Sequence, residues 1–231
     1  MQKDTRNEAL NVLDLFSGIG GFSLGLERAG FKTIAFCETE PYCRDVLRKH
    51  WPDVPIHGDI RELDGTQYRG TVDVVCGGWP CQAFSSASRG RKVMPNMWPE
   101  YLRIVGEVRP WFVIAENVPA APWESVRSGL RNLGYDTQTH HIELPYRRHI
   151  RKRTYVVAYS DRNRKPRGAL HEEMAQLPSD AGILWPAIPE SVGMDDGVPR
   201  RMDRLRALGN AVIPQIPEII GRAILDVSPQ S

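Results

Sequence analysis

The sequence has no long apolar run. None approaches the roughly 20 consecutive apolar residues that a helix needs to cross a bilayer. The first ten residues, MQKDTRNEAL, are polar and lack the apolar core of a secretory signal peptide. We therefore expect a cytoplasmic protein with no membrane partner.

Cysteine is scarce, and its spacing argues against the common cysteine-based sites. The 4 cysteines, Cys37, Cys43, Cys76 and Cys81, form no C-x-x-C pair. In a reducing compartment we expect free thiols rather than a disulfide framework, and the spacing does not suit zinc. We therefore expect no bound metal. The sequence also has no internal repeats.

The charge is nearly balanced overall but uneven along the chain. Net charge is +2 over 231 residues, yet residues 140–170 hold nine lysines and arginines and two acids. That window carries +7, so the remainder carries −5. A basic block suits a polyanionic partner, and it is equally typical of a solvated surface. With 41% apolar and 25% charged residues, the composition is that of one generous globular domain, with or without a small appendage.

Short apolar runs alternate with segments of helical spacing through the first two thirds of the chain. The expected strands are 10–16, 32–38, 54–59, 71–78, 111–117, 135–144 and 153–160. The expected helices are 22–30, 41–51, 97–108 and 123–134, several marked by a proline at the start or a glycine at the end. This alternation predicts an α/β sheet with helices on both faces.

The chain changes character after residue 160. Residues 161–200 are rich in proline, glycine and charge, and they predict a long irregular insertion. Helical spacing resumes over residues 201–227. We therefore divide the chain into a main domain, residues 1–160 and 201–231, and a small region, residues 161–200.

Glycines, acids and a cysteine follow the expected strands at their carboxyl ends. They are residues 17–21 after the first strand, Glu38 after the second, Asp59 after the third, Cys81 after the fourth and Glu116 at the fifth. Sheets of this kind bind ligands just outside the carboxyl ends of their strands. The coincidence predicts a binding site there, and it is a stronger signal than any single motif.

The first of these turns, DLFSGIGG, resembles a nucleotide-binding turn but is not G-x-G-x-x-G. Gly18 and Gly20 fit, while Ser23 stands at the third position. Glycines let the backbone approach a ligand, Glu38 can accept from ribose hydroxyls, and Asp59 can accept from an adenine amino group. A ligand with an adenosine half and no pyrophosphate fits, and S-adenosylmethionine is one. The alternative is a turn that serves only the fold.

The stretch GGWPCQAFSS, residues 77–86, places Cys81 directly after Pro80. Proline restricts φ and so stiffens the chain before the thiol. A nucleophilic cysteine reacts as the thiolate, and the cations of Arg89, Arg91 and Lys92 would lower its pKa. From these residues alone a buried turn cysteine is an equal alternative. The other three cysteines lie in apolar contexts typical of a core.

Seven segments stand in a fixed order along the chain. They are DLFSGIGGFSLGLERAGF, CE, GDI, GGWPCQAFS, AENV, RHIRKRTYVVA and LGNAVIP. In this order they resemble the motifs of the cytosine-5 DNA methyltransferase family over nearly the whole chain. The resemblance implies a Rossmann-like S-adenosylmethionine-dependent methyltransferase sheet, with residues 161–200 as a small target-recognition region and the rest as the catalytic, cofactor-binding domain.

The resemblance implies a covalent mechanism on a cytosine flipped out of duplex DNA. Cys81 would add to C6 of the base, and C5 would then accept the methyl group of S-adenosylmethionine. Glu116 would hydrogen-bond the N3 edge of the base. Arg151, supported by Arg153, would contact the cytosine carbonyl or position the thiolate. A base would then remove the C5 proton, and Cys81 would leave.

The resemblance also implies where the cofactor binds. The residues at its methionine end would be Phe16, Ser17, Gly18, Gly20 and Gly21. The remaining contacts would be Glu38 at the ribose, Asp59 and Ile60 at the adenine, Pro80 and Met97 along the pocket, and Asn210 and Val212 from the C-terminal segment. Asn117 would order the turn around Pro80 rather than touch substrate.

Two features depart from the family pattern. His149 stands where the arginine motif usually opens with glutamine, which bears on the placement of the arginines. The region 161–200 is short for a stand-alone target-recognition domain, so it would read few bases, rely on the loop 82–96, or need a partner. Its basic start, DRNRKPR, would contact phosphates, which position DNA without specifying sequence.

Three other functions stay open. An RNA enzyme of the tRNA-methylating branch would use the same chemistry, although Gln82 and the basic insertion favour DNA. A catalytically silent DNA-binding relative would not require Cys81, Glu116 and both arginines together. A dinucleotide oxidoreductase explains neither the missing third glycine nor the cysteine. We expect a monomer that acts on double-stranded DNA, alone or beside a cognate restriction endonuclease.

Overall fold

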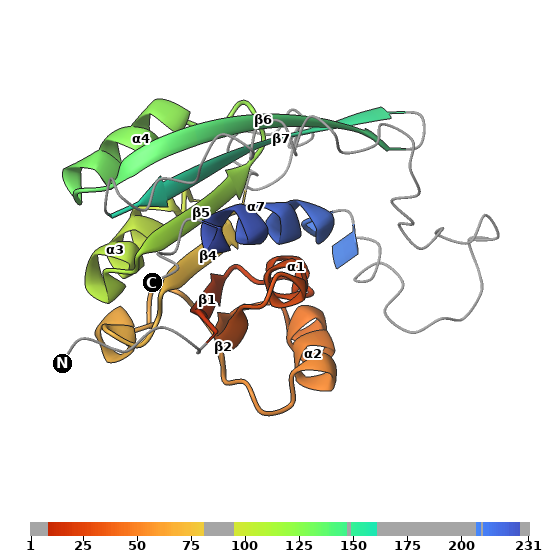
Figure 1. Ribbon diagram of the computed structural model, residues 1–231. Helices are drawn as coiled ribbons and strands as arrows, with labels where there is room; N and C mark the ends of the chain where they lie inside the picture. Colours follow the sequence, from red (N-terminus) through yellow and green to blue (C-terminus); the bar gives the residue numbers. More distant parts are fainter. Residues whose placement is uncertain (1–8, 81–94, 147–148, 161–206, 209, 227–231) are drawn as a thin grey trace.

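A seven-stranded sheet forms the centre of the protein (Figure 1). The computed structural model describes residues 9–80, 95–146, 149–160, 207–208 and 210–226. The strands are β1 (Asn11–Leu15), β2 (Lys32–Cys37), β3 (Ile56–His57), β4 (Val74–Gly78), β5 (Phe112–Asn117), β6 (Asp136–Tyr146) and β7 (His149–Tyr159). Their order across the sheet is β3-β2-β1-β4-β5-β7-β6.

The strand order reverses beside β1. The chain runs from β1 outward to β2 and β3, then returns to place β4 on the other side of β1 and continues to β5. All neighbouring pairs among these five strands are parallel, whereas β7 runs antiparallel to β5 and β6 antiparallel to β7. Parallel sheets bind ligands at such a reversal, outside the carboxyl ends of the strands. The topology therefore points to the ends of β1 and β4.

Helices cover both faces of the sheet. They are α1 (Gly21–Arg28), α2 (Pro41–His50), α3 (Trp98–Val108), α4 (Trp123–Asn132) and α7 (Gln215–Leu225), with a 3₁₀ turn η1 (Gly65–Tyr68). One buried cluster joins α3 and α4 to the sheet, and a second joins α1 and α7 to the opposite face. Figure 1 shows α7 lying beside α1. The predicted α/β fold with helices on both faces is confirmed.

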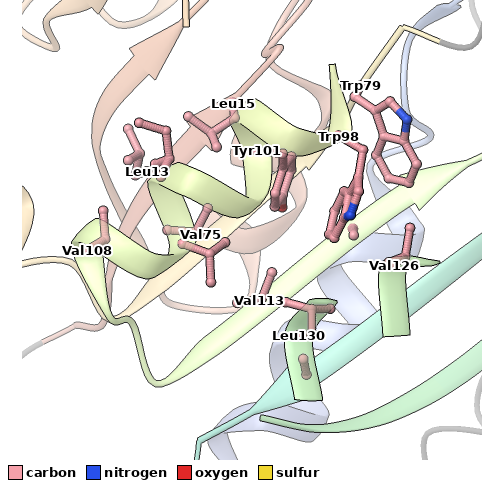
Figure 2. Close-up of a cluster of buried hydrophobic side chains, with 14 of the residues drawn as sticks. Leu13, Leu15, Val75, Trp79, Trp98, Tyr101, Val108, Val113, Val126 and Leu130 are labelled. Carbon is pink, nitrogen blue, oxygen red and sulfur yellow. The ribbon is translucent and has the colours of Figure 1, made fainter. Parts of the chain in front are cut away.

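The core follows the alternation of side chains along each strand. On β1, Leu13 and Leu15 face α3, while Val12 faces α1 and α7. Figure 2 shows the first of these clusters, in which Tyr101 of α3 and Leu130 of α4 cover the strand side chains. Fully burying one such side chain stabilises the fold by about 1.5–3 kcal/mol. The free thiols of Cys37, Cys43 and Cys76 are buried, in line with their reading as small core residues.

The helical structure that the spacing over 201–227 indicates is not continuous. Residues 211–213 are not helical, and α7 begins only at Gln215. Ile213 precedes Pro214, and a residue before proline is disfavoured in a helix. The third strand is also shorter than the expected 54–59, because only Ile56 and His57 pair with β2. The region 161–200 lies outside the described residues.

Among the described helices, none is long and apolar enough to cross a bilayer.

Candidate active site

The turn after β1 holds three residues in the left-handed backbone region. Phe16 has φ +52°, Gly18 +55° and Gly20 +85°. For glycine this is easy, but for a bulky residue such as Phe16 it costs about 1–3 kcal/mol, which only a well-supported structure maintains. The Phe16 ring stacks on Tyr101 with centroids 6.5 Å apart. The Ser17 hydroxyl donates to the Asp14 carbonyl at 2.6 Å, which ties the turn back to β1.

The glycines of this turn and of α1 serve two different purposes. A Cβ on Gly18 would have nothing within 4 Å, so this side of the turn opens onto free space. A Cβ on Gly21 would lie only 2.4 Å from the carbonyl oxygen of Val212, and one on Gly25 only 2.1 Å from that of Pro214. The first glycine therefore leaves room beside the turn, whereas the other two let the C-terminal segment pack directly on α1.

Glu38 stands at the end of β2 and organises the backbone around it. Its Oε2 accepts a hydrogen bond from the Gly18 amide at 2.7 Å, and its Oε1 accepts one from the Glu40 amide at 2.8 Å. The residue is only 9% exposed. Each carboxylate oxygen has a further lone pair, so Glu38 can still accept from a ligand. The carboxylate thus joins the turn after β1 to the chain entering α2.

Glu116 lies near the end of β5 in a buried setting. Its Oε1 forms an ion pair with Arg153 Nε at 2.9 Å. Burial raises the pKa of Glu116, and the positive charges of Arg153 and Arg151 oppose that shift. A Cβ on Gly78 would lie 2.4 Å from Glu116 Oε2, so glycine at this position leaves room for the carboxylate. Glu116 can therefore stay protonated at a higher pH than an ordinary glutamate does.

Asn117, the next residue, orders the chain before Pro80. Its side-chain amide donates to the carbonyl of Trp79 at 3.0 Å, and its Oδ1 accepts from the Val118 amide at 2.8 Å. These contacts agree with an ordering role for Asn117, but the residue also lines the cleft described below, so its expected lack of contact with substrate stays a prediction. It holds the end of β4 against the end of β5.

An aromatic cluster packs around Trp79, the residue directly after β4 whose carbonyl Asn117 holds. Trp79 packs against Trp98 and Trp123 with centroids 5.0 and 5.5 Å away, and Trp98 stacks on Tyr101 at 5.1 Å (Figure 2). Trp79 is the residue before Pro80, and Trp98 is the first residue of α3. The cluster therefore fixes two chain segments, those ending at Pro80 and beginning near Met97, against the core.

A cleft with a volume of about 230 Å³ brings most of these groups together. The predicted site residues that line it are Phe16, Ser17, Gly18, Glu38, Pro80, Glu116, Arg153, Asn210 and Val212. Those that do not line it are Gly20, Gly21, Asp59, Ile60, Met97 and Arg151. Cys81 lies outside the described residues. The cleft thus opens at the carboxyl ends of β1, β2, β4 and β5, where the topology places a ligand.

Sequence reasoning did not assign several residues that line the cleft. They are Phe22, Thr39, Glu40, Tyr42, Cys43, Gly78, Trp79, Val118, Ala207 and Ala211. The signal that could have found some of them is position, since residues 39–43 follow directly on Glu38 and enter α2. Of the charged residues that the structure describes along the cleft, three are acids, Glu38, Glu40 and Glu116, and one is a base, Arg153. Because Arg153 pairs with Glu116, the carboxylates of Glu38 and Glu40 are the ones that suit a cationic ligand.

Asp59 pairs with a neighbouring side chain and is not among the residues that line the cleft. The guanidinium of Arg61 forms an ion pair with Asp59. Hydrogen bonds from the side chain and the backbone amide of Arg61 lower the pKa of Asp59 to about 2. Ile60 is 2% exposed and belongs to the core under α3. The adenine contacts assigned to Asp59 and Ile60 stay predictions.

A further acid, Asp14, is fully buried under the turn after β1. The hydroxyl of Ser23 donates to its Oδ2 at 2.7 Å. Burial raises the pKa of Asp14 to about 8, while the hydrogen bonds from Ser23 oppose the shift. The carboxyl group is therefore mostly protonated at neutral pH.

Metal ligands do not gather in the part of the chain that the structure describes: no group of three or more His, Cys, Asp or Glu side chains there could hold an ion.

Comparison with known proteins identifies related methyltransferases. Type II methyltransferase M.Eco47II of Escherichia coli is 37% identical over 142 residues, which cover 56% of this chain and 34% of that protein. Type II methyltransferase M2.BsuMI of Bacillus subtilis is 32% identical over 160 residues, covering 61% and 40%. The chain thus spans about a third to two fifths of the length of these curated relatives.

Solved structures share the fold. A protein described as a DNA modification methyltransferase encoded within an Escherichia coli prophage aligns with a TM-score of 0.52 and 29% identity, covering 65% of this chain and 47% of that one. DNMT2 of Spodoptera frugiperda aligns with a TM-score of 0.54 and 20% identity, covering 65% and 50%, which shows the fold alone. The model of the C-5 cytosine-specific DNA methylase family matches residues 10–182, about three quarters of the chain. The chain therefore belongs to the C-5 cytosine-specific DNA methylase family.

Proposed function

We propose that this protein transfers a methyl group from S-adenosylmethionine to C5 of a cytosine flipped out of duplex DNA. The observation that carries the proposal is the cleft itself. It combines a glycine turn backed by Glu38 with a buried carboxyl group, Glu116, paired to Arg153. One part suits an adenosine-containing cation and the other suits a base with both donors and acceptors on its edge. Family membership supports the same reaction.

The residues present fit S-adenosylmethionine. The turn leaves open space beside Gly18, next to the carboxylate of Glu38, so a ribose or methionine group has room to approach the backbone. The carboxylates of Glu38 and Glu40, among the described lining residues, complement a ligand that carries a sulfonium charge. The residues that would hold the cofactor are Phe16, Ser17, Gly18, Glu38, Pro80, Asn210 and Val212. When bound, S-adenosylmethionine supplies an electrophilic methyl group.

The chain itself supplies the groups that activate the base. Cys81 would add through its sulfur to C6 of the cytosine, which makes C5 nucleophilic. Once C5 carries the methyl group, loss of its proton to a base would restore the C5–C6 double bond and release the Cys81 thiolate. The Glu116 carboxyl, with its raised pKa, would share a proton with N3 as negative charge develops on the ring. Arg153 would hold Glu116 in place through their ion pair. The target base must leave the stack, because a stacked cytosine exposes neither face.

We also propose the setting in which this reaction takes place. The relatives are named Type II methyltransferases, which supports DNA modification in the cytoplasm, alone or beside a cognate restriction endonuclease. The region 161–200 would contact the target sequence, and its basic start, DRNRKPR, would bind phosphates. We propose a monomer acting on double-stranded DNA.

A mechanism-based trap tests the proposal. The protein is incubated with S-adenosylmethionine and duplex DNA in which 5-fluorocytosine replaces cytosine. Fluorine at C5 cannot leave as a proton does, so we expect a covalent protein–DNA adduct that resists denaturation. The Cys81→Ser variant is the control and should give no adduct. An adduct on tRNA but not on DNA would assign the chain to RNA, and DNA binding without an adduct on either would identify a catalytically silent binder.

A further inference from the structure

We infer that Arg151 is a positioning residue that fixes the C-terminal wall of the cleft by holding the backbone carbonyl of Ala211. The guanidinium Nη2 of Arg151 donates to that carbonyl at 2.9 Å, across 60 residues of sequence. Arg151 does not line the cleft, whereas Ala211 does. The role differs from that of Arg153, which lines the cleft and pairs with Glu116.

The two arginines lie on one face of β7 but reach different partners. Residues two apart on a strand point to the same face, so Arg151, Arg153 and Tyr155 share one side. That side faces α1, because Tyr155 packs edge-on against Phe22 with centroids 6.3 Å apart. Arg153 reaches inward to β5, and Arg151 reaches the segment that precedes α7. The strand therefore supports both the carboxyl group of the cleft and its C-terminal wall.

The segment needs such support because it is not helical. Residues 211–213 make no regular structure, and Ala211 is only 7% exposed. A buried backbone carbonyl costs free energy unless it accepts a hydrogen bond, and a charged donor gives a strong one. Further along, the Ile213 carbonyl accepts from Ile216 in the first turn of α7. Arg151 thus satisfies a carbonyl that lies just outside the helix.

The opposite side of the segment rests on α1. The carbonyl of Val212 lies so close to Gly21 that a Cβ there would approach it to 2.4 Å. Consecutive carbonyls are therefore held from two directions, that of Ala211 by Arg151 and that of Val212 by packing on Gly21. Asn210 and Val212, the residues that flank Ala211, both line the cleft. Loss of Arg151 should loosen this wall and weaken binding of the ligand that contacts it.

The test combines a cofactor-independent measurement with a cofactor-dependent one, since the second rests on the function proposed above. Hydrogen exchange by mass spectrometry is measured on the full chain for Arg151→Ala and Arg151→Lys. Lys152→Ala is the matched control, because Lys152 is exposed and pairs with Glu143 at 2.7 Å. We expect Arg151→Ala to speed exchange in peptides covering 210–216, Arg151→Lys to recover part of the protection, and Lys152→Ala to have no effect. Gly21→Ala should also speed exchange in these peptides, because the added Cβ would clash with the carbonyl of Val212.

Calorimetry with S-adenosylmethionine and steady-state methylation complete the test. We expect Arg151→Ala to weaken cofactor affinity about tenfold, because binding would then have to order about one residue of backbone in the loosened wall. The KM for the cofactor should rise more than kcat falls, and Arg151→Lys should recover part of the affinity. Unchanged exchange in Arg151→Ala would overturn the inference, as would a collapse of kcat with normal cofactor affinity. If the unaltered protein does not bind S-adenosylmethionine, the proposed function fails, and hydrogen exchange alone decides the role of Arg151.

Discussion

Two carboxylates at strand ends that border the same cleft are held in different ways. Glu38, after β2, accepts hydrogen bonds from two backbone amides, those of Gly18 and Glu40. Glu116, in β5, faces the guanidinium of Arg153 from a strand formed later in the chain. The first is fixed by backbone amides of two chain segments, and the second by an arginine side chain.

The difference shows how one fold gives two acids different chemistry. Backbone amides are neutral donors with fixed positions, so they orient the Glu38 carboxylate as an acceptor for a ligand. Around Glu116, burial favours the protonated form while the arginines favour the ionised form, and burial is the larger effect. Glu38 is thus suited to binding, and Glu116 is suited to holding or giving a proton.

The largest effect is expected from Glu116→Gln. Glutamine keeps the shape of the side chain but cannot change its protonation state, and it ends the ion pair with Arg153. We expect the single-turnover rate of cytosine methylation to fall by about 100-fold or more, the range for losing an acid–base or charge-stabilising group. Cofactor affinity by calorimetry should stay close to that of the unaltered protein. Glu143→Gln, an exposed acid on β6, is the control, and near-normal turnover in Glu116→Gln would remove Glu116 from the mechanism.

An intermediate effect is expected from Glu38→Ala. The substitution leaves the amides of Gly18 and Glu40 without their acceptors and removes the proposed ribose contact. We expect S-adenosylmethionine affinity to fall by about tenfold or more, as for other lost hydrogen bonds to a charged group, while DNA binding is retained. Calorimetry measures the cofactor affinity, and a gel-shift assay measures DNA binding. Glu62→Ala, an exposed acid, should change neither, and equal cofactor affinity in Glu38→Ala would refute the ribose assignment.

The smallest effect is expected from Asp14→Asn, and it concerns stability rather than turnover. Asp14 has a pKa of about 8 in the folded protein against an ordinary pKa of 3.8, so between these values the folded protein holds a proton that the unfolded chain has lost. Stability should therefore fall as pH rises through this window, by at most about 1.4 kcal/mol per pH unit from this group. Between pH 5 and pH 9, the melting temperature of Asp14→Asn should fall less than that of the unaltered protein. Identical pH profiles for both proteins would show that Asp14 ionises normally.

Much of the fold could be predicted because its signals are local. The turn DLFSGIGG ends a strand and starts a helix, and Pro41 begins α2 at the expected place. The acid after the second strand, Glu38, was also predictable from its position at a strand end. The region before α7 was not, because helical spacing of apolar residues continues across 211–213 while Pro214 prevents the helix from extending through them.

The glycines show where local reasoning stops. Gly18 and Gly21 belong to one motif and look alike in sequence, yet one borders open space and the other packs against Val212, nearly 200 residues later. The pairing of Arg153 with Glu116 is similar, because alternation on a strand gives the face of a side chain but not its partner. Such roles depend on which distant segments meet.

By itself, the sequence determined the alternation of strands and helices, the glycine turn and the placement of acids at strand ends, because hydrophobic periodicity and turn chemistry act over a few residues. Only the tertiary structure decided that Glu38 is held by amides and Glu116 by an arginine, that Asp59 pairs with Arg61, and that Arg151 donates to the carbonyl of Ala211. The physical reason is that burial, ion pairing and close backbone approach are properties of segments brought together from far apart in the chain.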